Sequence, residues 1–126
     1  IRSLPMHDDA ENDRRRAAER FFSQRFRDDV RASDCAAAVG VSVPRLRQLL
    51  AAWYGKPYTH ILAEQRVREA GRLLVATEKS IRDIARQSGF PDADYFFKVF
   101  KRYTGRTPLT YRSGNSVHRV PERKGN

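Results

Sequence analysis

The sequence has very little cysteine, methionine and tryptophan, with one residue of each among 126. Because the single cysteine is Cys35, no disulfide can form within the chain and no zinc site can be built from several cysteines. The histidines, His7, His60 and His118, lie too far apart in the sequence to show metal-ligand spacing. No run approaches the roughly 18 apolar residues of a membrane-spanning helix. These absences favour a chain without cofactors or membrane segments in a reducing, cytoplasmic setting.

The sequence also lacks the motifs of common catalytic sites. It contains no glycine-rich phosphate loop and no nucleophile paired with a general base at a recognisable spacing. We therefore expect that the protein is not an enzyme.

Positive charge is what the sequence has in excess, with a formal net charge of +10. Residues 1–29 carry as many acidic as basic side chains, so the excess belongs to the rest of the chain. An excess of positive charge of this kind favours an acidic partner, most often nucleic acid or an anionic membrane surface.

Apolar residues recur with a helical period along most of the chain, and no strand-like alternation stands out. A short helix, a glycine and a longer helix are predicted twice, around Gly40 and again around Gly89. These glycines lie 49 residues apart, so the pattern repeats in register. Between the two patterns, a helix that follows Pro57 and ends near Ala76 measures roughly 28 Å at about 1.5 Å per residue.

A short helix, a tight turn and a longer helix describe a helix-turn-helix, whose second helix fits the major groove of duplex DNA. A connecting helix of the predicted length can set two recognition helices into successive major grooves, because one duplex turn measures about 34 Å. The sequence therefore predicts an all-α fold with two helix-turn-helix subdomains joined by a long connecting helix.

The expected N-caps of the helices are Ser33 and Ser42 in the first subdomain and Ser80 in the second. Composition and helical period together predict the domain organisation. We expect a linker or tail over residues 1–12, a first subdomain over 13–56, a connecting helix over 57–77, a second subdomain over 78–112 and a mobile basic tail over 113–126.

The segment 90–103 combines six aromatic residues with three basic residues. Such interleaving suits a surface that binds single strands, because bases stack on rings while phosphates pair with cations. On a helical wheel, however, Phe96, Phe100 and Tyr103 share one face, and Lys98 lies on the opposite face. Most of the rings are therefore expected in the core. A single-stranded nucleic acid or RNA-binding module that uses this segment is the alternative.

The segment 80–112 reads SIRDIARQSGFPDADYFFKVFKRYTGRTPLTYR and resembles the signature of the AraC/XylS transcription regulators. The residues that match the family pattern are Ile81, Ile84, Ala85, Gly89, Phe90, Asp92, Tyr95, Phe96, Lys98, Phe100, Lys101, Arg102, Gly105, Thr107, Pro108, Tyr111 and Arg112. The resemblance extends more loosely back to about Val30.

The resemblance implies a bipartite domain of about seven helices that binds promoter DNA. It also implies an effector-binding or dimerisation domain upstream in the full-length protein. We therefore expect the sequence-specific, double-stranded DNA-binding domain of a transcription activator. We expect RNA polymerase as a further partner, and a cytoplasmic location on the nucleoid through DNA.

Candidate DNA contacts lie on the outward faces of the two predicted recognition helices. Arginine and lysine suit guanine O6 and N7, glutamine suits adenine, and an acidic side chain can accept from cytosine N4. In the family, Arg or Lys at the position of Lys98 commonly reaches a base edge. Phe97 either touches a thymine methyl group or sugar, or packs on a neighbouring helix. The expected contacts are Pro44, Arg45, Arg47, Gln48, Asp94, Tyr95, Phe97, Lys98, Lys101 and Arg102.

The first predicted recognition helix departs from the family pattern. Ala51 and Ala52 stand where members often have two lysines, so two potential phosphate contacts are missing. Cys35 aligns with a core leucine of the family and is expected to be buried. Arg112 and the cations that follow it either attract phosphates or form a solvated tail.

Overall fold

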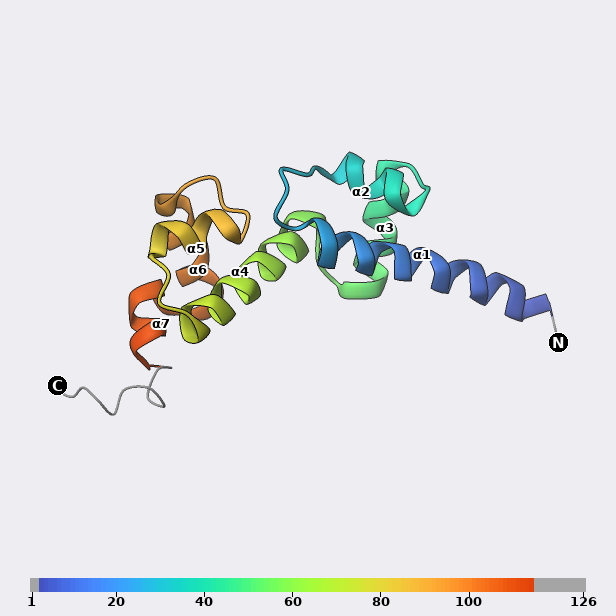
Figure 1. The fold of residues 1–126 in the computed structure, drawn as a ribbon. Helices are drawn as coiled ribbons and strands as arrows, with labels where there is room; N and C mark the ends of the chain where they lie inside the picture. Colours follow the sequence, from blue (N-terminus) through green and yellow to red (C-terminus); the bar gives the residue numbers. More distant parts are fainter. Residues whose placement is uncertain (1–2, 115–126) are drawn as a thin grey trace. The chain divides into compact units, whose positions relative to one another are not determined.

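The computed structural model describes residues 3–114, which form seven helices and no strand (Figure 1). The helices are α1 (Ser3–Arg25), α2 (Ala32–Val39), α3 (Val43–Tyr54), α4 (Tyr58–Ala76), α5 (Ile81–Gln87), α6 (Ala93–Thr104) and α7 (Pro108–Gly114). The chain divides into two compact units, Ile1–Gln65 (unit 1) and Arg66–Asn126 (unit 2). The predicted all-α class and the bipartite arrangement are confirmed.

The long helix α4 contains the boundary between the two units. The first part of α4, up to Gln65, belongs to unit 1, and the part from Arg66 onward belongs to unit 2. The predicted connecting helix is therefore shared between the two cores, because each unit buries part of its apolar surface. Leu62 is buried in unit 1, whereas Leu74 is fully buried in unit 2.

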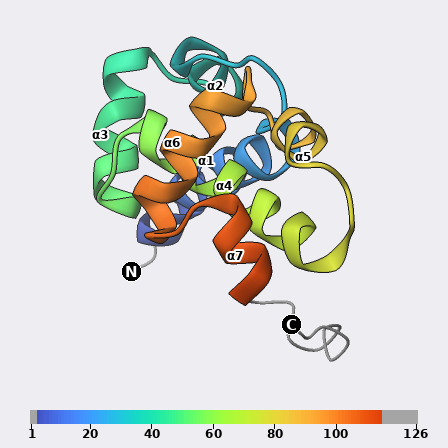
Figure 2. The ribbon, with the colours of Figure 1, turned by 90° about the vertical axis from the view of Figure 1, so that its left-hand side faces the viewer.

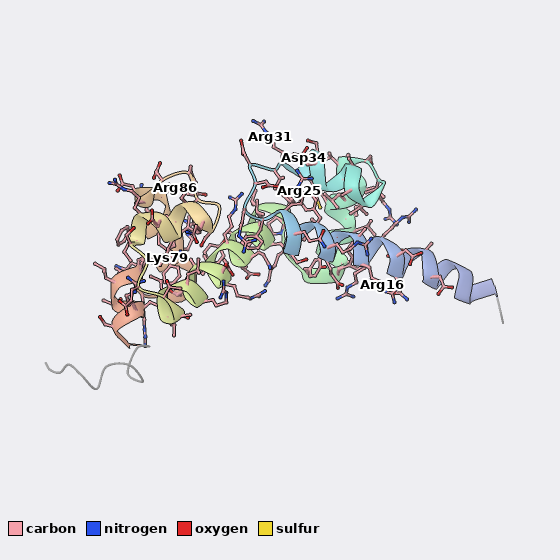
Figure 3. The ribbon with its side chains drawn as sticks, viewed as in Figure 1. Arg16, Arg25, Arg31, Asp34, Lys79 and Arg86 are labelled. Carbon is pink, nitrogen blue, oxygen red and sulfur yellow. The ribbon has the colours of Figure 1, made fainter. Side chains whose placement is uncertain are left out.

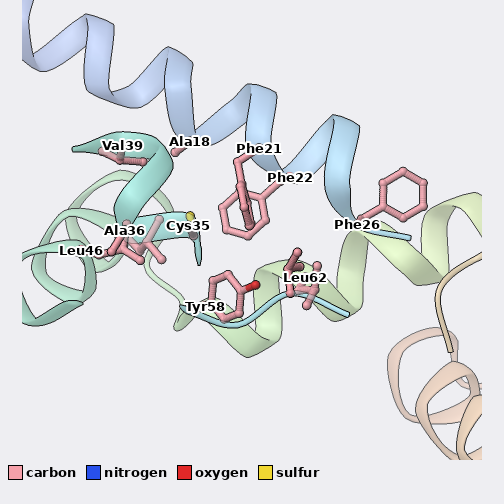
Figure 4. Packing of buried hydrophobic residues seen from close by; sticks show 12 residues of the cluster. Ala18, Phe21, Phe22, Phe26, Cys35, Ala36, Val39, Leu46, Tyr58 and Leu62 are labelled. Atoms are coloured by element: carbon pink, nitrogen blue, oxygen red, sulfur yellow. The ribbon is translucent and has the colours of Figure 1, made fainter. Parts of the chain in front are cut away.

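The core of unit 1 forms where α1 packs on α2, α3 and the start of α4 (Figure 4). The ring of Phe22 lies 5.7 Å from that of Phe21 and 5.7 Å from that of Tyr58, measured between centroids. Cys35 and Leu46 are fully buried in the same cluster, as expected for Cys35. Burial of such aromatic and aliphatic surface is the main force that holds α3 in place.

Local hydrogen bonds set the ends of the helices in unit 1. The hydroxyl oxygen of Ser42 accepts from the backbone N–H of Arg45 at 3.2 Å, so Ser42 caps α3 as predicted. The prediction that Ser33 caps α2 is wrong. The carboxylate of Asp34 accepts from the backbone N–H of Arg31 at 2.7 Å, and the helix therefore begins one residue after Arg31.

The core of unit 2 is aromatic, and α6 supplies its largest residues. Phe96 and Phe100 are fully buried, with their ring centroids 5.4 Å apart. Phe90, which precedes α6, lies 4.9 Å from Phe96. Asp92 caps α6, since its carboxylate accepts from the backbone N–H of Tyr95 at 2.8 Å. The chain then turns into α7 at the end of α6 (Figure 2).

Arg112 of α7 anchors the end of α4. Its guanidinium donates to the backbone carbonyls of Leu74, Thr77 and Lys79 at 3.0, 3.1 and 2.8 Å. Carbonyls at the end of a helix have no partner within the helix, so this side chain satisfies groups that would otherwise need water. Arg112 is therefore a structural residue, and its interpretation as part of a solvated tail is wrong.

The structure differs from the sequence interpretation at both ends of the chain. Most of the segment 1–12, predicted as a linker or tail, is helical, because α1 begins at Ser3. Ion pairs one turn apart support this helix, for example between Arg15 and Glu19 at 3.6 Å. At the other end, α7 continues to Gly114, and the rest of the predicted tail lies outside the described residues.

Candidate nucleic-acid interface

The two predicted recognition helices, α3 and α6, correspond residue by residue. Each has 12 residues, with an N-cap side chain that accepts a backbone hydrogen bond and a left-handed glycine after the last residue. The caps are Ser42 and Gly55 for α3, and Asp92 and Gly105 for α6. A position in α3 therefore corresponds to the position 50 residues later in α6.

The outward face of α3 carries the four predicted contacts of unit 1. Pro44, Arg45, Arg47 and Gln48 are all exposed. The guanidinium of Arg45 donates to the side-chain carbonyl oxygen of Gln48 at 3.2 Å. This contact occupies the carbonyl oxygen of Gln48, whose amide nitrogen is a donor.

The outward face of α6 carries the predicted contacts of unit 2. Asp94, Lys98, Lys101 and Arg102 are exposed, and no salt bridge forms at these four residues within the described chain. Phe97 is half-buried, and its ring centroid lies 6.3 Å from that of Phe96. Part of the Phe97 ring is therefore buried against the core, and the rest stays exposed beside the outward face.

The rings of segment 90–103 form no stacking surface. Phe90, Phe96 and Phe100 are buried, and Tyr103 and Phe97 are only partly exposed. Tyr95, with 49% of its surface exposed, is the one largely accessible ring of this segment. Because single-strand binding needs several accessible ring faces along a groove, the structure disfavours the single-stranded alternative.

Cations on the first helix of unit 2 were missed by sequence reasoning. Arg82 and Arg86 are exposed on α5, four residues apart and thus on one face. Arg86, which is labelled in Figure 3, contacts the carboxylate of Asp83 at 3.3 Å. The spacing of four between Arg82 and Arg86 is a signal that could have identified this pair. The first helix of a helix-turn-helix crosses the DNA backbone, so two arginines on one face of it suit phosphates.

An open hollow of about 430 Å³ lies where α5 meets the start of α6. It is bordered by Arg82, Ala85, Arg86, Phe90, Pro91, Asp92, Ala93 and Asp94. Both signs of charge border the hollow, so it has no strong preference for a small anion.

The described residues contain no group of three or more His, Cys, Asp or Glu side chains placed to hold a metal ion. No helix between residues 3 and 114 has the length and apolar character needed to cross a membrane.

Comparison with known proteins decides the family. A family model described as a helix-turn-helix domain matches residues 35–114, which is more than half of the chain. A solved AraC-type regulator from Chromobacterium violaceum is 25% identical and superposes with a TM-score of 0.77, over 82% of this chain and 92% of that one. The chain belongs to the AraC/XylS family. It is a double-stranded DNA-binding domain of a transcription regulator, and the RNA-binding alternative finds no support.

Two further proteins are similar to this chain, one in structure and one in sequence. The DNA-binding domain of AdpA, solved with a target DNA, is 22% identical and has a TM-score of 0.78, over 88% of this chain. An uncharacterized HTH-type transcriptional regulator of Staphylococcus aureus is 34% identical over 92 residues, which is 73% of this chain. The chain spans 12% of the length of that staphylococcal relative.

Proposed function

We propose that this domain binds promoter DNA by sequence as part of a transcription activator, with α3 and α6 in successive major grooves. The observation that carries the proposal is the matched pair of recognition helices, each held by a buried face and presenting an exposed polar face. The 19 residues of α4 also support it, since a helix of that length measures roughly 28 Å, comparable to one duplex turn of about 34 Å.

Each predicted contact has a role that follows from its chemistry. Lys98 suits guanine, and Asp94 suits the amino group of cytosine. In unit 1, the amide donor of Gln48 and the guanidinium of Arg45 together suit the acceptors N7 and O6 of guanine. The remaining predicted contacts, Pro44, Arg47, Tyr95, Phe97, Lys101 and Arg102, contact sugars, phosphates or thymine methyl groups.

The wider setting follows from the family and from the length of the relatives. Because the chain spans 12% of the staphylococcal regulator, we propose that the full-length protein carries an effector-binding or dimerisation domain upstream. We propose RNA polymerase as a partner, a cytoplasmic location on the nucleoid, and no catalytic activity. The support for the last point is that the family and the fold are those of DNA-binding regulators.

The experiment that tests sequence recognition begins with selection of duplex sites from a random pool. The affinity of the enriched site and of a scrambled duplex is then measured for the wild type, Lys98→Ala and Arg102→Ala. We expect Lys98→Ala to lower the ratio of the two affinities by about 10-fold or more, since a base contact contributes about 1–3 kcal/mol of discrimination. Arg102→Ala should weaken both duplexes equally.

Two results would contradict the proposed function. The first is a random pool that yields no enriched sequence. The second is a competition in which single strands displace every duplex, because that preference belongs to a stacking surface.

A further inference from the structure

The first helices of the two units, α2 and α5, also correspond, with an offset of 49 residues. Asp34 matches Asp83 near the helix start, the buried Ala36 matches the buried Ala85, and Gly40 matches Gly89 in the turn. With the offset of 50 between α3 and α6, every outward position of unit 1 has a counterpart in unit 2. The two surfaces that face DNA in the proposed function can therefore be compared pair by pair.

The first pair of helices differs in charge. On α5, Arg82 and Arg86 are exposed, and their counterparts on α2 are the exposed residues Ser33 and Ala37. Arg86 is paired with Asp83 at 3.3 Å, but 71% of the arginine side chain and 52% of the aspartate side chain are exposed. Such an exposed ion pair contributes little to stability, so Arg86 can readily exchange Asp83 for another anion.

The recognition helices differ in the same direction at their last turn. Lys101 and Arg102 are exposed on α6, and their counterparts on α3 are Ala51 and Ala52, which are also exposed. Beside Ala51 the surface is hollowed by an open space of about 280 Å³. Arg47 and Lys56 also border this space, so the cations nearest to Ala51 come from neighbouring positions and not from positions 51 and 52.

The second residue after each recognition helix completes the contrast. Lys56 follows α3 and its ammonium donates to both carboxylate oxygens of Glu64 at 2.9 Å. The ammonium of Lys56 is therefore already paired with a carboxylate of unit 1. Its counterpart Arg106 is exposed in unit 2.

We propose that unit 2 supplies the phosphate anchoring of this domain through Arg82, Arg86, Lys101 and Arg102, which we call the anchoring set. Unit 1, in which Arg47 is the cation assigned to the backbone, has less backbone support and contributes mainly base contacts. The first helix of a helix-turn-helix crosses the backbone, which places Arg82 and Arg86 near phosphates. This inference rests on the proposed DNA binding. It adds that the two similar units contribute unequally to the electrostatic attraction for phosphates.

The physical signature of anchoring is the salt dependence of binding. Each phosphate that a protein cation neutralises releases condensed counterions, and the slope of log K against log salt steepens by about 0.9. This contribution does not depend on base sequence, so it can be measured on a mixed-sequence duplex without knowledge of the operator.

The test measures binding of the 126-residue chain to a labelled mixed-sequence duplex at several potassium chloride concentrations. Alanine replaces each member of the anchoring set in turn. We expect each replacement to make the slope shallower by about 0.9 and to weaken binding. Arg72→Ala is the charge-matched control, because Arg72 is an exposed arginine of α4 that pairs with Glu69 at 2.8 Å. The control should leave the slope unchanged.

A second pair of variants adds anchoring to unit 1. Ala51→Lys and Ala52→Arg restore cations at exposed positions, and both new residues are good helix formers. We expect each variant to steepen the slope by about 0.9 and to tighten binding to the mixed-sequence duplex. Because these variants gain binding, a loss of folding cannot imitate the expected result.

The outcomes separate the inference from the function on which it rests. If the wild type binds no duplex at any salt concentration, the proposed DNA binding fails. If the wild type binds with a steep slope but the anchoring-set variants keep that slope, the inference is overturned. It is also overturned if the Arg72 control makes the slope as shallow as they do, because net charge alone would then explain the effect.

Discussion

The ring of Tyr111 in α7 lies against Gly71 in the interior of α4. A Cβ atom added at Gly71 would lie 3.1 Å from the Tyr111 hydroxyl oxygen and 3.4 Å from the nearest ring carbons. The same ring also meets Phe100 of α6, with centroids 5.0 Å apart and the rings perpendicular. A glycine in a helix costs about 1 kcal/mol relative to alanine. Here the close approach of the tyrosine explains why glycine stands at this position.

The contact between these two residues predicts a coupled effect on stability. In the wild type, the helix-forming advantage of Gly71→Ala is offset by the clash with the hydroxyl oxygen. In the Tyr111→Phe background, that oxygen is gone and Gly71→Ala should raise the free energy of unfolding by about 1 kcal/mol. A double-mutant cycle from urea unfolding measures the coupling and cancels the cost of the lost hydroxyl. Equal effects of Gly71→Ala in both backgrounds would show that the contact does not matter.

Arg112 should matter for stability and not for DNA binding. Arg112→Ala removes hydrogen bonds to three carbonyls, and charged hydrogen bonds contribute about 1.5–3 kcal/mol each at most. We therefore expect a loss of about 2–4 kcal/mol in the free energy of unfolding. Arg112→Lys should recover only part of it, because an ammonium cannot reproduce the planar fork. The slope of log K against log salt for duplex binding should stay unchanged in the folded Arg112→Lys variant, and a shallower slope would assign Arg112 to DNA.

Two serines at opposite ends of α5 predict opposite effects of the same substitution. Ser88 is fully buried and its hydroxyl oxygen has no hydrogen-bond partner in the described structure. Ser88→Ala should therefore raise the free energy of unfolding by about 1 kcal/mol, since a buried unpaired hydroxyl is costly. Ser80 caps the helix, with its oxygen 3.0 Å from the backbone nitrogen of Asp83. Ser80→Ala should lower the same quantity by about 1 kcal/mol. Chemical denaturation of both variants checks the pair, and equal signs would contradict it.

Cys35 should make stability depend on pH at the alkaline end. Burial raises the pKa of the Cys35 thiol to about 12, from an ordinary value of 9.0. The unfolded chain therefore loses this proton at a lower pH than the folded protein, and the folded state loses stability as pH rises through that interval. The stability advantage of the wild type over Cys35→Ala should shrink by up to about 1.4 kcal/mol per pH unit above pH 9.

The Cys35→Ala variant also serves as the reference for every other titrating group. Urea unfolding of both proteins on either side of the ordinary pKa isolates the thiol. If the difference in the free energy of unfolding between the two proteins stays constant through the alkaline range, the thiol ionises equally in the folded and unfolded states. Rapid alkylation of Cys35 in the folded protein would contradict its burial in the same way, because the thiolate is the reactive form.

Local signals in the sequence predicted most helix ends correctly. Ser42 and Ser80 cap the helices that follow them because a cap needs only a hydrogen bond three residues away. Ser33 failed because Asp34, next to it, accepts the N–H of Arg31 and starts the helix earlier. Ser33 and Asp34 are both residue types that cap helices, and residue type alone does not decide which of the two does so.

The candidate site was predictable in part. The helical wheel separated Lys98 from the buried Phe96 and Phe100, because a period of 3.6 residues fixes which positions share a face. It could not decide Phe97, which lies at the flank and is half-buried. The DNA contacts themselves stay predictions.

The sequence by itself determined that this protein is all-α, that it repeats a helix-turn-helix and that it resembles the AraC/XylS family. Those conclusions depend on caps, glycine turns and apolar spacing, which act over three or four residues. Only the tertiary structure decided which charged side chains already have hydrogen-bond partners within the protein. Arg112 is held by carbonyls 33 to 38 residues away, and Lys56 by Glu64 across a turn. Such pairs form when separate segments pack together, so they leave no signal in the spacing of residues along the chain.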